Sequence, residues 1–338
     1  MKKRTIFTAL MVLCLSTFIF VGISFAAPVL KIAHPRPLQS ETQTELEAFV
    51  EDVEKGTEGR VKCKIYGANQ LGSPEQVMEN VGMGTVEMLL GWPNTTLDKR
   101  FEVYCLPGAV GTYEEGRKLY KQGSPFIKLL NDVYGKFDQV IIAAYPSGFQ
   151  YSSFKNEPPK SVYDPYAKKN MKIRQASLKY LVYITDGLGY TTSVLPWGEI
   201  FTALQTGIID GLGSFSAEST YLTLRDAIKY TLPISTYLDV FFLTINKEVL
   251  DGFSDADRAA VAKAAARFQE KRFDRVVASD KEYLEKLSKH GVTVMPVTEE
   301  QKKAFQKRIK EYVWLHLRKD LGADFFDKAT KAVEDSLK

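Results

Sequence analysis

One arginine in this chain has the residue type and the position to bind a carboxylate group. Arg174 ends a short strand-like run, residues 172–174, inside the stretch 171–216 around which the rest of the chain is organised. A guanidinium carries five donors in a fixed planar fork, which can hold a carboxylate in a two-pronged grip. The chemistry that this residue predicts is the noncovalent capture of an acid.

The elements around Arg174 predict a parallel β-sheet. The strand 172–174 is followed by a helix at 178–187, a strand at 191–195, a helix at 198–206 and a buried strand at 208–210. Ile200 and Leu204 lie four apart on one helix face, and Gly207 stands where a left-handed cap is needed. In such sheets ligands bind at the carboxyl ends of the strands, which is where Arg174 lies.

A similar helix, glycine and strand pattern occurs at residues 72–89. Setting Gly84 on Gly207 aligns four further pairs: Val77 with Ile200, Val81 with Leu204, Val86 with Ile209 and Glu87 with Asp210. The pattern alone leaves open whether this is a duplication or chance. A true duplication predicts two similar α/β lobes that share one cleft.

Residues 1–26 predict a secretory signal peptide and therefore a periplasmic protein. A basic start precedes an uncharged apolar core, and Ser24-Phe25-Ala26 fits a small-x-small cleavage site. An uncleaved membrane anchor is the alternative, since the apolar run is near the length that spans a bilayer. Removing this segment leaves a net charge of +1 and no basic tract, so we expect no nucleic-acid partner.

Cysteine and histidine spacing predicts no metal site. Cys63 and Cys105 remain after residue 26, and His34, His290 and His316 are scattered. An oxidising compartment would allow the two cysteines to pair, but both lie in apolar runs where a buried free thiol is equally natural. The pairing therefore stays open.

Enzyme signatures are missing from the sequence. There is no metalloprotease, phosphate-loop or nucleophile-elbow motif. Glu199 and Asp210 suggest a pair of catalytic carboxylates at first sight. A first-turn helix charge and a turn residue explain them more simply. We predict that the protein is not an enzyme and uses no cofactor.

The chain order predicts two lobes and a helix that spans both. Lobe I takes residues 27–150, with 240–253 returning to it, and lobe II takes 151–239. The apolar strand 140–145, broken at 146–148 and resumed at 149–154, marks the crossing. An uninterrupted helical pattern at 254–290 spans both lobes. Residues 291–338 form a C-terminal strand and helices that pack mainly on lobe II.

Several motifs identify a family resemblance over nearly the whole chain after residue 26. The run LPWGEIFTALQTGIIDG at 195–211, with MKIR at 171–174, closely resembles the DctP-type solute-binding proteins of TRAP transporters. The likeness continues through ANQLG at 68–72, LTINK at 243–247 and FSDAD at 253–257.

This resemblance implies a fold and a function. Two α/β lobes, joined by a long bridging helix, close over a small organic acid, which passes to integral membrane TRAP subunits driven by an ion gradient. The family's carboxylate-clamping arginine falls on Arg174, and a polar residue near the ligand falls on Ser177. The aromatic residue of the P-[WF]-x-E run falls on Trp197.

Two positions depart from the family pattern. A common second arginine is replaced by Gln150, and a common asparagine is replaced by Ser214. The loss of one cation favours a monocarboxylate over a dicarboxylate or a strongly anionic sugar acid. Arg36 or Lys155 remains a candidate replacement for the missing charge. An apolar wall is expected from Trp92, Phe149, Tyr151, Trp197 and Phe215.

The sequence therefore predicts an extracytoplasmic receptor for a small organic acid, with Arg174 forming a salt bridge in the cleft. An ABC-type receptor and an exported enzyme on the same scaffold are the alternatives.

Overall fold

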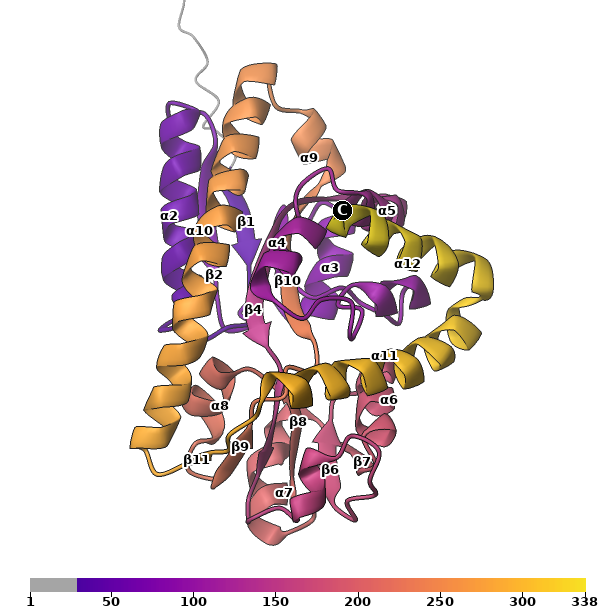
Figure 1. Ribbon diagram of the computed structural model, residues 1–338. Coiled ribbons are helices and arrows are strands. Elements are labelled where there is room, and N and C mark those ends of the chain that lie inside the picture. The colour runs from indigo at the N-terminus through magenta and orange to yellow at the C-terminus, as the bar shows by residue number, and fades with distance from the viewer. Residues whose placement is uncertain (1–28) are drawn as a thin grey trace, which may run out of the picture.

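The computed structural model describes residues 29–338, so the predicted signal peptide lies outside the described residues. Two β-sheets divide this part of the chain into two lobes (Figure 1). The first sheet has the order β2-β1-β3-β10-β4, formed by Lys62–Tyr66, Val29–Ala33, Met88–Gly91, Leu238–Asn246 and Gln139–Phe149. The second has the order β11-β9-β5-β8-β6-β7, formed by Thr293–Val294, Tyr230–Leu232, Tyr151–Phe154, Gly211–Phe215, Lys172–Gln175 and Thr191–Val194.

Helices surround each sheet and define the lobes. Lobe I is the first sheet with α2 (Glu41–Gly56), α3 (Pro74–Gly82), η1 (Lys99–Val103), α4 (Tyr113–Leu119), α5 (Pro125–Tyr134), η2 (Gly135–Phe137) and α9 (Lys247–Asp251). Lobe II is the second sheet with η3 (Lys160–Tyr163), α6 (Lys179–Gly187), η4 (Trp197–Glu199), α7 (Ile200–Thr206) and α8 (Ala217–Leu224). The two-lobed α/β fold expected from the sequence is confirmed.

The two segments that the sequence aligns, one in each lobe, make equivalent hydrogen bonds. Gly84 and Gly207 both have positive φ, +70° and +76°, and each donates to the carbonyl three residues earlier. The side chain of Glu87 accepts from the backbone of Lys31 at 2.6 Å, and that of Asp210 accepts from Lys172 at 2.7 Å. The alignment drawn from the sequence therefore extends to the glycine turn after each helix and to the bond that ties the following residues to a neighbouring strand.

Two antiparallel strands carry the chain between the lobes. β4 leads into β5 through Gln150, and β10 returns beside them (Figure 1). At the crossing the backbone N–H of Gln150 donates to Tyr237 at 2.9 Å, and Thr236 donates back to Gln150 at 2.9 Å. The hinge is therefore a pair of hydrogen-bonded strands.

Helix α10 (Asp255–Lys289, 35 residues) runs along both lobes. It packs on α2 and β4 of lobe I and on α8 of lobe II (Figure 1). At 1.5 Å per residue it is about 50 Å long. Ser254 caps its first turn by accepting from the Asp257 backbone at 3.1 Å. The bridging helix predicted from its uninterrupted pattern is present.

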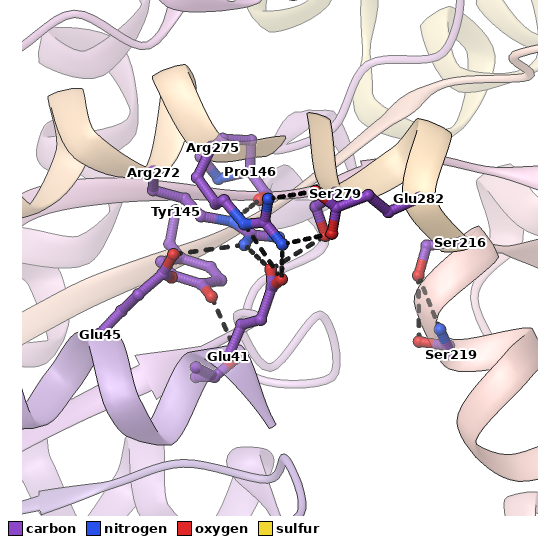
Figure 2. Close-up of polar contacts among 11 residues, drawn as sticks. Glu41, Glu45, Tyr145, Pro146, Ser216, Ser219, Arg272, Arg275, Ser279 and Glu282 are labelled. Atoms are coloured by element: carbon purple, nitrogen blue, oxygen red, sulfur yellow. Dashed lines mark hydrogen bonds and ion pairs between the residues drawn. The ribbon is translucent and has the colours of Figure 1, made fainter. Parts of the chain in front are cut away.

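A buried charge network joins α10 to lobe I near the crossing strands (Figure 2). The Arg272 side chain is 1% exposed and donates to Glu41 at 2.8 Å and to the Pro146 carbonyl at 2.8 Å. Arg275 binds the other Glu41 oxygen at 2.6 Å. Burial alone would raise the pKa of Glu41, but hydrogen bonds from Arg275 and Arg272 outweigh it and hold that pKa below its ordinary value.

The C-terminal helices divide between the lobes. α11 (Glu299–Leu321) packs on α6 of lobe II, whereas α12 (Ala323–Leu337) packs on α5 and α4 of lobe I (Figure 1). The expectation that residues 291–338 pack mainly on lobe II is therefore wrong for α12. Gly322, with φ +86°, reverses the chain between the two helices and allows the second to return to lobe I.

Two strand predictions also need correction. Residues 208–210 are not a strand, since β8 begins at Gly211 and Ile208 is 56% exposed. Pro146 does not break β4, which continues to Phe149. Its strand pairing includes a register shift between Asp239 and Val240, and the Pro146 carbonyl accepts from Arg272. A proline is tolerated at such an irregularity because no ladder N–H is needed there.

The two cysteines of the described chain are free thiols. Cys105 is buried, and its sulfur accepts a hydrogen bond from the Val240 backbone at 3.2 Å. Burial raises the pKa of the Cys63 thiol to about 12.

We predict that a chain beginning at residue 27 has two titratable thiols after denaturation under non-reducing conditions. Its melting temperature should be the same with and without dithiothreitol. A single reductant-sensitive transition with no free thiol would show that the two are paired.

Candidate ligand-binding site

A cavity of about 640 Å³ lies between the two lobes. Both lobes and both crossing strands contribute to its wall, which is largely apolar, with several aromatic rings and a few charged groups. Its principal side chains are Arg36, Glu75, Trp92, Tyr104, Gln150, Arg174, Gln175, Ser177, Tyr180, Trp197, Ser214, Phe215, Glu218, Ser219, Tyr237, Asp239 and Phe241. A cavity of this size fits a small molecule.

Arg174 lies at the carboxyl end of β6, as the sequence predicts. Its Nε and Nη2 atoms donate to the Leu195 carbonyl at 2.9 and 2.7 Å. This carbonyl occupies one edge of the guanidinium and leaves the Nη1 and Nη2 end for another acceptor. Burial lowers the pKa of Arg174 to about 10, so the group remains charged at neutral pH.

Aromatic rings form the wall beside Arg174. Trp197 begins η4, is 53% exposed and stacks on Phe215 with ring centroids 5.2 Å apart and planes inclined by 26°. The Arg174 guanidinium lies 5.8 Å from the centroid of the same Phe215 ring. Ser177, in the loop between β6 and α6, is exposed at the cavity wall. Arg174, Ser177, Trp197 and Phe215, all named as site candidates from the sequence, therefore line the same cavity.

The two departures from the family pattern also line the cavity. Gln150 is buried at the hinge, and its amide Nε2 donates to the Gly148 carbonyl at 2.9 Å. Ser214 has φ +66°, a conformation unusual for a residue with a Cβ, and its hydroxyl accepts from Gln175 at 3.1 Å. Both side chains therefore line the cavity, and neither adds a charge to it.

Lobe I supplies a second aromatic wall. Trp92 follows β3, and its indole N–H donates to Glu75 at 2.6 Å while its ring packs edge-on against Phe241 at 5.4 Å. Arg36 lines the cavity, whereas the Lys155 ammonium donates to the Gln205 carbonyl and does not line it. Of the two candidate replacement cations, Arg36 is the one placed in the cleft.

Tyr151 and Phe149 lie outside the cavity wall, contrary to expectation. The Tyr151 hydroxyl donates to Asp280 of α10, and Phe149 packs on Tyr113 at 4.8 Å. Successive side chains of an extended chain point to opposite sides, so Gln150 in the cavity directs both neighbours away from it.

Sequence reasoning missed three tyrosines of the cavity wall. Tyr104 of lobe I and Tyr180 of lobe II join hydroxyls at 3.0 Å, and Tyr237 packs edge-on against Tyr180 at 5.5 Å. Burial raises the pKa of all three far above the ordinary tyrosine value. The signal for Tyr237 was its place at the start of the returning strand, which must pass the cleft.

Two negative observations apply to residues 29–338. No group of three or more histidine, cysteine, aspartate or glutamate residues within this range is arranged to hold a metal ion. Over the same range no helix combines the length and apolarity that crossing a bilayer requires.

Two α/β lobes that are joined by crossing strands, with a buried arginine in the intervening cavity, form the two-lobed fold of the periplasmic binding proteins. Residues 32–320 match the model of the bacterial extracellular solute-binding proteins, family 7. The chain belongs to this family, which contains the solute-binding proteins of TRAP transporters. Members of the family are solute receptors and not enzymes.

Individual relatives agree with this assignment. The ectoine-binding periplasmic protein TeaA of Halomonas elongata is 24% identical over 294 residues, covering 83% of each chain. The C4-dicarboxylate-binding periplasmic protein DctP of Rhodobacter capsulatus is 28% identical over 64% of this chain and 65% of its own. A TRAP periplasmic solute-binding protein of Haemophilus influenzae, solved with bound L-gulonate, superposes with a TM-score of 0.79 at 21% identity, covering 91% of this chain and 99% of its own.

Proposed function

We propose that this chain is the periplasmic receptor of a TRAP transporter and captures a small monocarboxylate, with Arg174 pairing the carboxylate. The observation that carries the proposal is the state of the Arg174 guanidinium. It is buried in the cavity wall, and its fixed partner is one backbone carbonyl. No carboxylate of residues 29–338 lies within ion-pair distance of it.

The physical chemistry of a buried charge supports this assignment. Removing an arginine from water is unfavourable unless an opposite charge and hydrogen bonds compensate it. A ligand carboxylate at the Nη1 and Nη2 end would supply both. Closure of the lobes around that carboxylate would remove the pair from water, which strengthens it. Ligand binding and closure would then favour each other.

The charges of the cavity favour one carboxylate over two. Arg36 and Arg174 line it together with three acidic residues, Glu75, Glu218 and Asp239. A second carboxylate would face these acids, which makes a dianion less favourable than a monoanion. The relatives named above are associated with ectoine, C4-dicarboxylates and L-gulonate, so this family accommodates several small polar solutes.

Delivery to the membrane completes the proposal. The predicted signal peptide at 1–26 would export the chain, and the closed receptor would present its acid to integral membrane TRAP subunits. Relatives with this fold are periplasmic binding proteins, which favours the same compartment for this chain. The family match favours a TRAP transporter over an ABC transporter as the partner.

A thermal-shift screen of organic acids tests the proposal. At a concentration of about 100 times its dissociation constant, a ligand adds about 2.7 kcal/mol to the free energy of unfolding. We expect at least one monocarboxylate to raise the melting temperature of the wild type and to have no effect on Arg174→Ala. If every acid that raises the melting temperature of the wild type also raises that of Arg174→Ala, the proposed function is contradicted.

A further inference from the structure

The cavity contains two similar groups of side chains, one from each lobe. In lobe II the Arg174 guanidinium lies 5.8 Å from the Phe215 centroid, and Trp197 stacks on that ring. In lobe I the Arg36 guanidinium lies 5.0 Å from the Phe241 centroid, and Trp92 packs on that ring. All six residues line the same cavity. Each lobe therefore offers an aromatic wall with an arginine beside it.

Arg36 connects the two lobes, and its guanidinium has an unpaired donor within the described residues. Its Nη1 atom donates to the Ser219 hydroxyl of α8 at 2.6 Å, across the cleft. Ser219 is in the first turn of α8, beside the capping residue Ser216 (Figure 2). The Nε atom of Arg36 is buried and has no hydrogen-bond partner among residues 29–338. A polar atom in this state is unfavourable, so the arginine favours a further acceptor.

Glu218 provides an acceptor in the same wall. Glu218 is 6% exposed, and in the part of the chain that the structure describes its buried Oε1 atom has no hydrogen-bond partner. Glu218 and Ser219 are neighbours in α8 and both line the cavity, so this carboxylate belongs to the same helix as the hydroxyl that Arg36 reaches. Within residues 29–338, an arginine with an unpaired donor and a carboxylate with an unpaired acceptor therefore both line the cavity.

A hydroxyl group matches this pair better than a second carboxylate does. A hydroxyl both accepts and donates, so it can accept from Arg36 and donate to Glu218. A carboxylate only accepts, and it would face Glu218 and the buried Asp239. Asp239 is itself bonded by the Ser147 hydroxyl at 2.6 Å and needs no ligand donor. The Arg36 end therefore favours a neutral polar group.

We propose that the ligand is a flat aromatic hydroxy acid, with its carboxylate on Arg174, its ring between the walls of Trp197 and Trp92, and its hydroxyl at Arg36 and Glu218. This inference rests on the proposed function, since Arg174 must hold the carboxylate. It adds the class of acid and two specificity-determining residues. A ring lies well against indole faces because offset stacking and edge contacts are both favourable.

Isothermal titration with matched pairs of acids tests the inference. The pairs are benzoate with 4-hydroxybenzoate, and cinnamate with 4-hydroxycinnamate, which places the hydroxyl farther from the carboxylate. We expect the hydroxylated member of at least one pair to bind tenfold or more tightly than its partner, because hydrogen bonds to charged groups are strong. The saturated analogue of that hydroxylated acid should bind at least tenfold more weakly than the aromatic acid. This analogue is trans-4-hydroxycyclohexanecarboxylate for 4-hydroxybenzoate and 3-(4-hydroxycyclohexyl)propanoate for 4-hydroxycinnamate.

Variants assign the effect to its residues. Arg36→Met and Glu218→Gln should each reduce the affinity ratio within the pair towards one. Lys155→Met is the matched control, because it removes a cation bonded to Gln205 outside the cavity, and it should keep the ratio. A ratio that survives Arg36→Met, or one that is also lost in Lys155→Met, would overturn the assignment of Arg36.

The outcomes separate the inference from the proposed function. If other acids bind with dependence on Arg174 but neither pair shows a hydroxyl preference, the ligand class is wrong and the receptor function stands. If terephthalate binds more tightly than 4-hydroxybenzoate, the claim that Arg36 favours a neutral polar group over a second carboxylate is wrong. If no acid depends on Arg174, both the inference and the proposed function fail.

Discussion

Replacing Arg174 by lysine should abolish acid binding even though the charge is kept. An ammonium is a point charge and cannot hold the Leu195 carbonyl on one edge while presenting a two-pronged end to a carboxylate. A buried carboxylate that is no longer properly paired costs about 3–5 kcal/mol, which corresponds to roughly 150- to 5,000-fold in affinity. Isothermal titration of the wild type and Arg174→Lys with the best acid measures this loss.

Arg225→Lys serves as the control for that substitution. Arg225 follows α8 in lobe II, is partly exposed, and donates to the Tyr221 carbonyl away from the cavity wall. Its replacement should leave the affinity unchanged within about twofold, since exposed pairs contribute little. Normal binding by Arg174→Lys would show that the guanidinium geometry is not needed and that Arg174 is not the clamp.

Replacing Arg272 by methionine should cause the largest loss of stability of any single charge substitution on α10. The change leaves the partly buried Glu41 and the Pro146 carbonyl without this donor and removes a cation 4.6 Å from the Tyr145 ring (Figure 2). Breaking a buried pair in this way costs about 3–5 kcal/mol. Urea unfolding monitored by circular dichroism gives the change in the free energy of unfolding.

Arg267→Met is the matched control on the same helix. Arg267 is 59% exposed and pairs with Asp52 of α2 at 3.0 Å. An exposed pair contributes at most about 1 kcal/mol, so its loss should be small. Equal effects of the two substitutions would mean that the buried network near the crossing strands does not hold α10 to lobe I.

A local sequence pattern predicted the place of Arg174 in the lobe II wall, and the family resemblance added Ser177 and Trp197. Arg174 and Trp197 each lie at the end of a strand or the start of a helix, where a few neighbouring residues decide the position. Gly207, in the left-handed conformation that a helix stop requires, ends α7 as expected. The residues of the site in this lobe lie near one another along the chain, compared with those of the lobe I wall.

The lobe I wall depended on contacts that the sequence does not display. Arg36 meets Phe241 and Ser219 across more than 180 residues of chain. Their proximity is fixed by the pairing of β10 with β3 and β4 and by the approach of the two lobes. A pattern of apolar residues predicts that such strands exist, but it does not specify their neighbours or their register.

The misplaced residues have local physical causes. Tyr151 was assigned to the cavity by residue type, although the alternation of side chains along a strand sets it opposite to Gln150. Ile208 was assigned to a strand by its apolarity. The turn after Gly207 instead leaves it exposed, while the Asp210 carboxylate accepts from Lys172 and the strand starts one residue later.

A crystal structure of the protein with the tightest-binding acid from the screen tests the central claim most directly. The account predicts the ligand carboxylate at the Nη1 and Nη2 end of Arg174, with both oxygens within hydrogen-bonding distance of the guanidinium and Leu195 still bound on the other edge. A carboxylate held by Arg36 instead, or an acid bound outside the cavity between the lobes, would contradict it.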